Sequence, residues 1–121
     1  TAAWQRSLVP DEVLLFRFSA LTYNSHRIHY DHRYTTEIER YPGLLVHGPL
    51  TAILLLDGVR RHYPRRRLAR FEYRAQRPLF VGKAMSVGGA PAANGDDVSL
   101  WASDHQGLLA MSATASFGKS E

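Results

Sequence analysis

The sequence has 121 residues, of which 45% are hydrophobic and 21% are charged, and it contains no cysteine. These values are typical of one globular domain spanning residues 1–121, and the lack of cysteine excludes disulfides and thiolate metal sites. The formal net charge is +4 and most of the cationic residues are arginines, whose guanidinium groups bind phosphate well. Charge alone leaves nucleic acid and a small phosphate-bearing ligand both open.

Membrane insertion and secretion are not indicated. No apolar run approaches the roughly 18 to 20 residues that a membrane-spanning helix needs, and residues 1–6 lack the apolar core of a signal peptide. We therefore expect a cytoplasmic protein without a membrane partner. The mitochondrial matrix is the alternative, because a protein that has lost a transit peptide would look similar. Since the sequence does not begin with methionine, a processed or truncated piece of a longer protein is also open.

Three helices are predicted in the first half of the chain. Apolar residues follow the acidic start at Pro10-Asp11 with helical spacing and predict a first short helix over residues 10–22. Asp31 is expected to cap a second short helix that ends near Arg40. A third helix is expected to begin at residues 48–49, because proline suits the first turn, and to end near Tyr63. Its apolar residues lie on almost every face of the helix, which indicates that the helix is largely buried.

Strands are predicted after Pro64, where apolar and polar residues alternate. Residues 70–76 predict a half-buried strand, residues 98–103 and 109–117 predict two more, and residues 83–90 predict a weaker one. Asn94-Gly95 is a strong turn signal between strands. Short helices, one long buried helix and then antiparallel strands predict an α+β fold. The simplest packing is a curved antiparallel sheet wrapped round the long central helix.

The densest polar cluster lies in residues 22–32 and contains His26, His29 and His32. A neutral imidazole has a pKa near 6.5 and can transfer protons near neutral pH. The alternative is a solvated loop whose histidines bond to the backbone. We expect no metal here, because no other segment supplies ligands at a suitable spacing.

Gly48 is the second candidate, at the start of the predicted long helix. Helix N-termini carry unpaired N–H groups and the positive end of the dipole, and a glycine lets a ligand approach its amide closely. That amide can bind a carbonyl oxygen on which negative charge develops. The alternative is that the glycine only permits the turn into the helix. Its neighbour His47 is either a packed, hydrogen-bonded residue or a ligand contact.

Residues 18–31 (FSALTYNSHRIHYD) and residues 41–50 (YPGLLVHGPL) together resemble the MaoC-like dehydratases. Within them, the closest branch is the type 2 hydroxyacyl-thioester dehydratases and mesaconyl-CoA hydratase-like proteins. The resemblance implies a hot-dog fold that acts as a homodimer or pairs with a second hot-dog lobe. It also implies (R)-specific hydration of 2-enoyl thioesters, or the reverse dehydration. The substrate would be an acyl-CoA or acyl-carrier-protein thioester, with no further cofactor.

The resemblance also implies roles for individual residues. Aligned with the hydratase motif Asp-x-Asn-Pro-x-His, His29 takes the position of the catalytic histidine, Asn24 that of the aspartate and His26 that of the asparagine. Gly48 takes the position of the glycine whose amide polarises the thioester carbonyl. An amide cannot accept a proton as a carboxylate does. We therefore expect His29 to exchange the proton with water, Asn24 to orient that water, and His26 and His47 to contact the substrate.

The basic stretch at residues 60–67 follows the predicted long helix. Most such runs are solvated, but Arg65 and Arg66 are candidates for holding the coenzyme A phosphates or an acidic carrier protein. No aromatic pattern suited to stacking bases accompanies the arginines, so we expect no nucleic acid. The leading hypothesis is thus an acyl-thioester hydro-lyase. The alternatives are a hot-dog thioesterase and a non-catalytic lobe that binds acyl-CoA or completes a partner's dimer.

Overall fold

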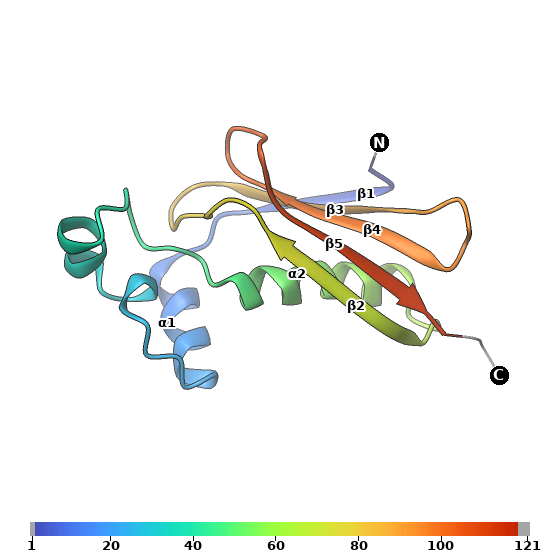
Figure 1. The fold of residues 1–121 in the computed structure, drawn as a ribbon, viewed down its shortest axis with the longest axis horizontal. Helices are drawn as coiled ribbons and strands as arrows, with labels where there is room; N and C mark the ends of the chain where they lie inside the picture. The colour runs from blue at the N-terminus through green and yellow to red at the C-terminus, as the bar shows by residue number, and fades with distance from the viewer. Residues whose placement is uncertain (1, 119–121) are drawn as a thin grey trace.

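A five-stranded antiparallel sheet lies along one side of a long helix, α2, in the computed structural model, which describes residues 2–118 (Figure 1). The strand order is β1-β3-β4-β5-β2, and every neighbouring pair is antiparallel. The predicted α+β fold is therefore confirmed. In chain order the elements are β1 (Trp4–Leu8), α1 (Glu12–Leu21), η1 (Arg27–His29), η2 (Tyr34–Ile38), α2 (Gly48–His62), β2 (Leu68–Ala75), β3 (Met85–Pro91), β4 (Asp97–Ser103) and β5 (Leu109–Phe117).

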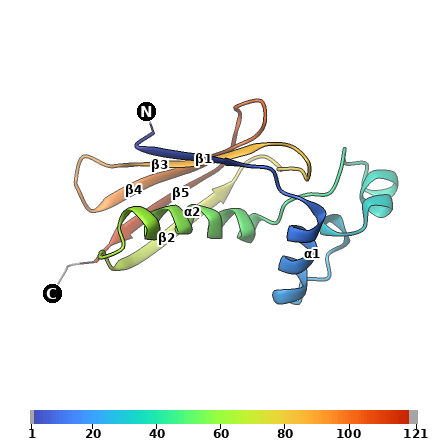
Figure 2. The same ribbon diagram turned by 180° about the vertical axis from the view of Figure 1, so that it is seen from behind.

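The core lies between α2 and the concave face of the sheet. α2 contacts β3, β4 and β5, and its residues Leu50, Leu55 and Val59 are buried. The prediction of a helix buried almost all round is wrong for this chain alone, because Ile53 on the opposite face is 50% exposed. The physical reason is that the sheet covers one side of α2 and no described element covers the other (Figures 1 and 2).

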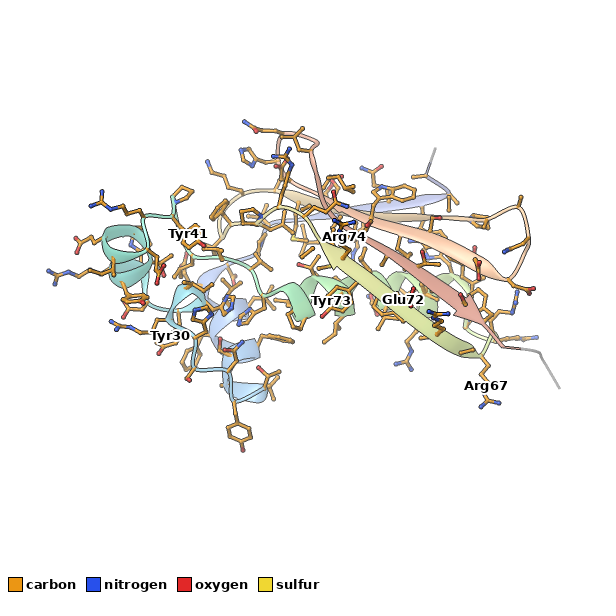
Figure 3. The ribbon with its side chains drawn as sticks, viewed as in Figure 1. Tyr30, Tyr41, Arg67, Glu72, Tyr73 and Arg74 are labelled. Carbon is orange, nitrogen blue, oxygen red and sulfur yellow. The ribbon has the colours of Figure 1, made fainter. Side chains whose placement is uncertain are left out.

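β2 forms one edge of the sheet and pairs only with β5 among the described strands. The strand was predicted to be half-buried, yet seven of its eight residues are exposed. Tyr73, labelled on this strand in Figure 3, is 47% exposed. An open edge strand offers unpaired backbone groups to a further strand. The alternation of apolar and polar residues in β2 therefore points to a surface that this chain does not cover by itself.

β1 was missing from the predicted elements. It pairs with β3, with Trp4 opposite Gly89 and Leu8 opposite Met85. Three polar residues in a row separate Trp4 from Leu8, so the segment lacks an apolar alternation. The Trp4 ring stacks on His62 at the end of α2, with ring centroids 4.3 Å apart. This one indole joins the edge strand to the long helix.

The Trp4 ring packs against Gly89, where there is no side chain. Gly89→Ala is therefore expected to destabilise the fold by about 1–3 kcal/mol through overpacking. An added Cβ would collide with the six-membered ring of Trp4 and would lie 2.8 Å from Leu100 Cδ2. Urea unfolding followed by Trp fluorescence measures the change. Gly43→Ala is the matched control, because a Cβ there meets nothing within 4 Å. Equal stabilities for both variants would contradict this account of Gly89.

The segment from α1 to η2 projects beyond the N-terminal end of α2 (Figure 2). Asp11 caps α1, where its carboxylate accepts a hydrogen bond from the Leu14 amide at 2.8 Å. Asp31 accepts from the Tyr34 amide at 3.0 Å, which confirms its predicted capping role, although the π-helical turn η2 ends at Ile38. Within residues 2–118, no helix combines the length and apolar character needed to cross a membrane.

Candidate active site

His29 has a fixed tautomer. It ends the 3₁₀ turn η1 and is 7% exposed. Its Nδ1 lies 2.7 Å from the carbonyl oxygen of Leu45. A carbonyl can only accept, so Nδ1 carries the proton and donates it. In the neutral ring, Nε2 is therefore the nitrogen with a free lone pair, which is the atom that a general base needs.

The surroundings of His29 favour its neutral form. Burial lowers the pKa of His29, the hydrogen bond to Leu45 partly opposes that effect, and the charge of His26 lowers the pKa further. The His26 ring lies edge-on to His29, with centroids 5.7 Å apart. At neutral pH His29 is therefore able to take a proton rather than already holding one.

His47 lies against His29 and is fully buried. The two imidazoles stack with centroids 3.7 Å apart and an interplanar angle of 18°. His47 Nε2 is 2.7 Å from Ser19 Oγ, and Phe18 packs edge-on against the same ring at 4.8 Å. The structure thus favours the packed, hydrogen-bonded interpretation of His47 over the ligand contact, because the buried ring has no free surface in this chain.

Burial and the nearby His29 lower the pKa of His47 to about 4. The unfolded chain, with a histidine pKa near 6.5, then binds more protons than the folded chain between pH 6.5 and pH 4. The contribution of neutral His47 to the free energy of unfolding is fully present above pH 6.5 and is lost as the pH falls toward 4. The loss is on the order of 3 kcal/mol. Urea unfolding at pH 7 and pH 4.5 measures this loss. His47→Gln should flatten the dependence; an unchanged slope would assign it to other groups.

Asn24 holds the loop that carries the histidines. It follows α1, its amide N–H donates to the Ser19 carbonyl at 2.9 Å, and its Oδ1 accepts from the His26 amide at 3.0 Å. The side-chain oxygen is thus engaged with the backbone, while the NH₂ group has no partner among residues 2–118. The water-orienting role of Asn24 remains a prediction, and the NH₂ group is the part of the side chain that is available for it.

Gly48 is the first residue of α2 and directly precedes Pro49. It is absent from the positive-φ residues, and a Cβ built on it meets nothing within 4 Å. The space around Gly48 therefore does not require a glycine, but the entry into the helix favours one, because proline disfavours helical geometry in a preceding residue that carries a Cβ. Its N–H donates to no acceptor in the described part of the chain. The glycine thus suits both alternatives, the entry into the helix and the approach of a ligand to the free amide.

A cavity of about 310 Å³ opens beside Gly48. It lies between the start of α2, the end of β2 and the start of β5, and its lining includes Thr51, Arg77 and Met111. Neither His29 nor Asn24 lines it. The single chain thus brings the amide and a cavity together at one end of α2, but it does not enclose the histidines in the same hollow.

The structure does not bring Arg65 and Arg66 to this site. Both follow the C-terminal end of α2, which spans 15 residues and therefore about 22 Å from Gly48. Arg66 lies 3.4 Å from an Asp96 carboxylate oxygen, and its guanidinium sits over the Phe117 ring at 4.4 Å. Within residues 2–118, no group of three or more histidine, aspartate or glutamate side chains is arranged to hold a metal ion.

Sequence reasoning missed Ser19. Its hydroxyl contacts His47 across 28 positions of the chain, a contact that helical spacing does not reveal. One signal was present, however. Leu15 and Ser19 are the two buried residues of α1 and are four positions apart, so the polar Ser19 occupies the same face as a core leucine. A polar residue on an apolar face needs a buried partner.

A sheet over one long helix, with an imidazole and a helix-terminal amide at its N-terminal end, defines a MaoC-like protein of the hot-dog class. The chain belongs to the hydroxyacyl-thioester dehydratase type 2 family, whose model matches residues 1–81. It is 49% identical over 113 residues to mesaconyl-C(4)-CoA hydratase of Chloroflexus aurantiacus, covering 93% of this chain and 39% of that protein. It is 38% identical over 80 residues to the mitochondrial hydroxyacyl-thioester dehydratase type 2 of Schizosaccharomyces pombe, covering 64% of this chain and 27% of that protein.

A solved structure shows the same fold. One chain of the ChsH1-ChsH2 complex from Mycobacterium tuberculosis has a TM-score of 0.84 at 15% identity, covering 99% of this chain and 96% of that one. This likeness confirms the predicted hot-dog fold, and the family match over residues 1–81 confirms the predicted family. This chain spans less than half the length of the two curated relatives.

Proposed function

We propose that this chain is a catalytic lobe of an acyl-thioester hydro-lyase, which adds water to a 2-enoyl thioester or removes it from a 3-hydroxyacyl thioester. One observation carries the proposal. A neutral imidazole with a free Nε2, on His29, and an unpaired helix-terminal amide, on Gly48, lie at the same end of α2. The ring of His47, the residue before Gly48, stacks on His29 and joins the two groups.

These groups can divide the reaction between them. The Gly48 N–H donates to the thioester carbonyl oxygen and stabilises the charge that develops there. His29 Nε2 takes a proton from water as the water oxygen bonds to C3 of the enoyl group. The C2–C3 π electrons move toward the carbonyl, and the proton on His29 is then returned to C2. The Asn24 NH₂ group orients the water, and His26 contacts the acyl group.

We further propose that a second hot-dog lobe completes the site, either as a second copy of this chain or as another lobe. The cavity beside Gly48 does not include His29, so a further surface is needed to enclose both. The open edge of β2 and the uncovered face of α2 provide a place for that lobe. The substrate carrier is coenzyme A or an acyl carrier protein. The proposed location is the cytoplasm, or the mitochondrial matrix.

An absorbance assay with crotonyl-CoA and mesaconyl-CoA tests the proposal. A hydro-lyase decreases the enoyl-thioester absorbance and releases no thiol. Thiol release, followed with a thiol reagent, would instead indicate the thioesterase alternative. Calorimetry tests the non-catalytic alternative. If the chain binds the enoyl thioester but does not turn it over, either by itself or together with a partner lobe, the non-catalytic alternative is supported and the catalytic one is overturned.

A further inference from the structure

His47 and Ser19 form a buried pair behind His29 that the proposed reaction does not use. The Ser19 hydroxyl is the hydrogen-bond partner of His47 Nε2, whereas His47 Nδ1 is buried without a partner among residues 2–118. A buried N–H without an acceptor is rarer than a buried acceptor without a donor. The proton of His47 therefore belongs on Nε2, where it is donated to Ser19 Oγ. The ring is neutral and has one defined orientation.

The stacking of the two rings decides which imidazole takes a proton. Two cations cannot stack favourably at a centroid distance of 3.7 Å in a buried site. His47 is fully buried, whereas His29 retains some exposure, so burial opposes charge on His47 more. The charge of His26 acts on His29 and the charge of His29 acts on His47, and each lowers the pKa of the ring that it acts on. A proton that arrives at this cluster is therefore held by His29.

His47 also connects the two groups of the proposed site, the His29 base and the Gly48 amide. Its backbone is the N-cap of α2, where its carbonyl accepts from the Thr51 amide at 3.1 Å. Its imidazole ring stacks on the ring of His29. The Leu45 carbonyl fixes the direction in which Nδ1 of His29 points, and the face of His47 fixes the plane of that ring. Together the two restraints determine where Nε2 of His29 points relative to the Gly48 amide.

We propose that His47 is a positioning residue, a neutral imidazole oriented by Ser19 on which the base His29 is held, and not a ligand contact. The proposal rests on the proposed function for its catalytic consequence. The arrangement of the three side chains can be tested without a substrate.

The test is ¹⁵N NMR of histidine-labelled protein, comparing wild type with Ser19→Ala. In the wild type, His29 should show the Nδ1–H tautomer and a pKa below 6.5. Loss of the Ser19 hydroxyl frees the His47 ring, so His29 should show mixed tautomers and a pKa that moves toward 6.5. Where turnover is measurable, kcat should fall about tenfold with little change in KM, and the acid limb of its pH profile should move to higher pH.

Thr22→Ala is the matched control, because Thr22 caps the C-terminal end of α1, near Ser19, but its hydroxyl bonds to the Phe18 carbonyl at 2.7 Å. It should leave the His29 signals unchanged. If Ser19→Ala does not fold, His47→Gln carries the test, since it keeps a donor for Ser19 but offers no ring to His29. A folded variant with an unchanged His29 tautomer and pKa would overturn the proposal. Shifted signals in a protein that turns over no enoyl thioester would overturn the proposed function alone.

Discussion

His29→Ala is expected to lower kcat for hydration of an enoyl thioester by about 10²–10⁴-fold, the usual contribution of a general base. The variant loses Nε2, the atom that takes the proton from water, while the Gly48 amide can still bind the thioester carbonyl. KM should therefore change much less than kcat. The decrease in enoyl-thioester absorbance gives both constants. Because burial lowers the pKa of His29, the wild-type kcat should persist below pH 6.5 before His29 becomes protonated.

His62→Ala is the matched control for this experiment. His62 also donates from Nδ1 to a backbone carbonyl, that of Gly58 at 2.9 Å, and its ring also stacks on an aromatic ring, that of Trp4. It lies at the other end of α2, so its loss should leave kcat within about twofold of wild type. A loss of less than about threefold in His29→Ala would remove His29 from the mechanism, and equal losses in both variants would indicate a general effect on folding.

Local patterns were sufficient to predict most of the fold. The helices and four of the strands carry their own apolar spacing, and Asp11 and Asp31 cap their segments as short-range hydrogen bonding requires. β1 could not be predicted in this way, because its partners, β3 and α2, lie far along the chain and its own sequence has no apolar alternation. Burial was overestimated for α2 and β2. Their apolar residues suit a surface that lies outside this chain.

The candidate site was predictable in part. Gly48 was a candidate from its place at a helix N-terminus, the resemblance singled out His29 among the histidines, and the structure places their elements together at one end of α2. The stacking of His47 on His29 could not be predicted, because it depends on the path of residues 41–47 back to the helix. The role of Ser19 was hidden for the same reason. Arg65 and Arg66 were assigned by charge alone, and charge does not reveal that the length of α2 separates them from Gly48.

Gly48→Pro is expected to lower kcat by about 10²–10³-fold, which is the effect of removing one donor to a developing oxyanion. The substitution removes the amide hydrogen and also restricts the first turn of α2, because the new proline precedes Pro49 and proline disfavours helical geometry in the residue before it. A helix does not use the N–H of its first residue, so proline is tolerated there. His47 already has the extended conformation that precedes a proline, with ψ of 135°. Because of the restriction before Pro49, thermal unfolding is expected at a lower temperature than in wild type, and the enoyl-thioester assay is run well below that transition, where the loss of kcat reports the amide.

Gly48→Ala distinguishes the effect of the backbone amide from the effect of having no side chain at this position. Alanine keeps the N–H, and its Cβ meets nothing within 4 Å apart from its chain neighbours, but it meets the same restriction before Pro49, so this variant controls for the lost stability. If the amide polarises the thioester, this variant should retain kcat within about tenfold of wild type, and any added bulk should raise KM because it meets the ligand. A folded Gly48→Pro protein with wild-type kcat would exclude the amide as the donor. A large loss of kcat in both variants would instead mean that the glycine is required because substrate or a partner lobe occupies the space above it.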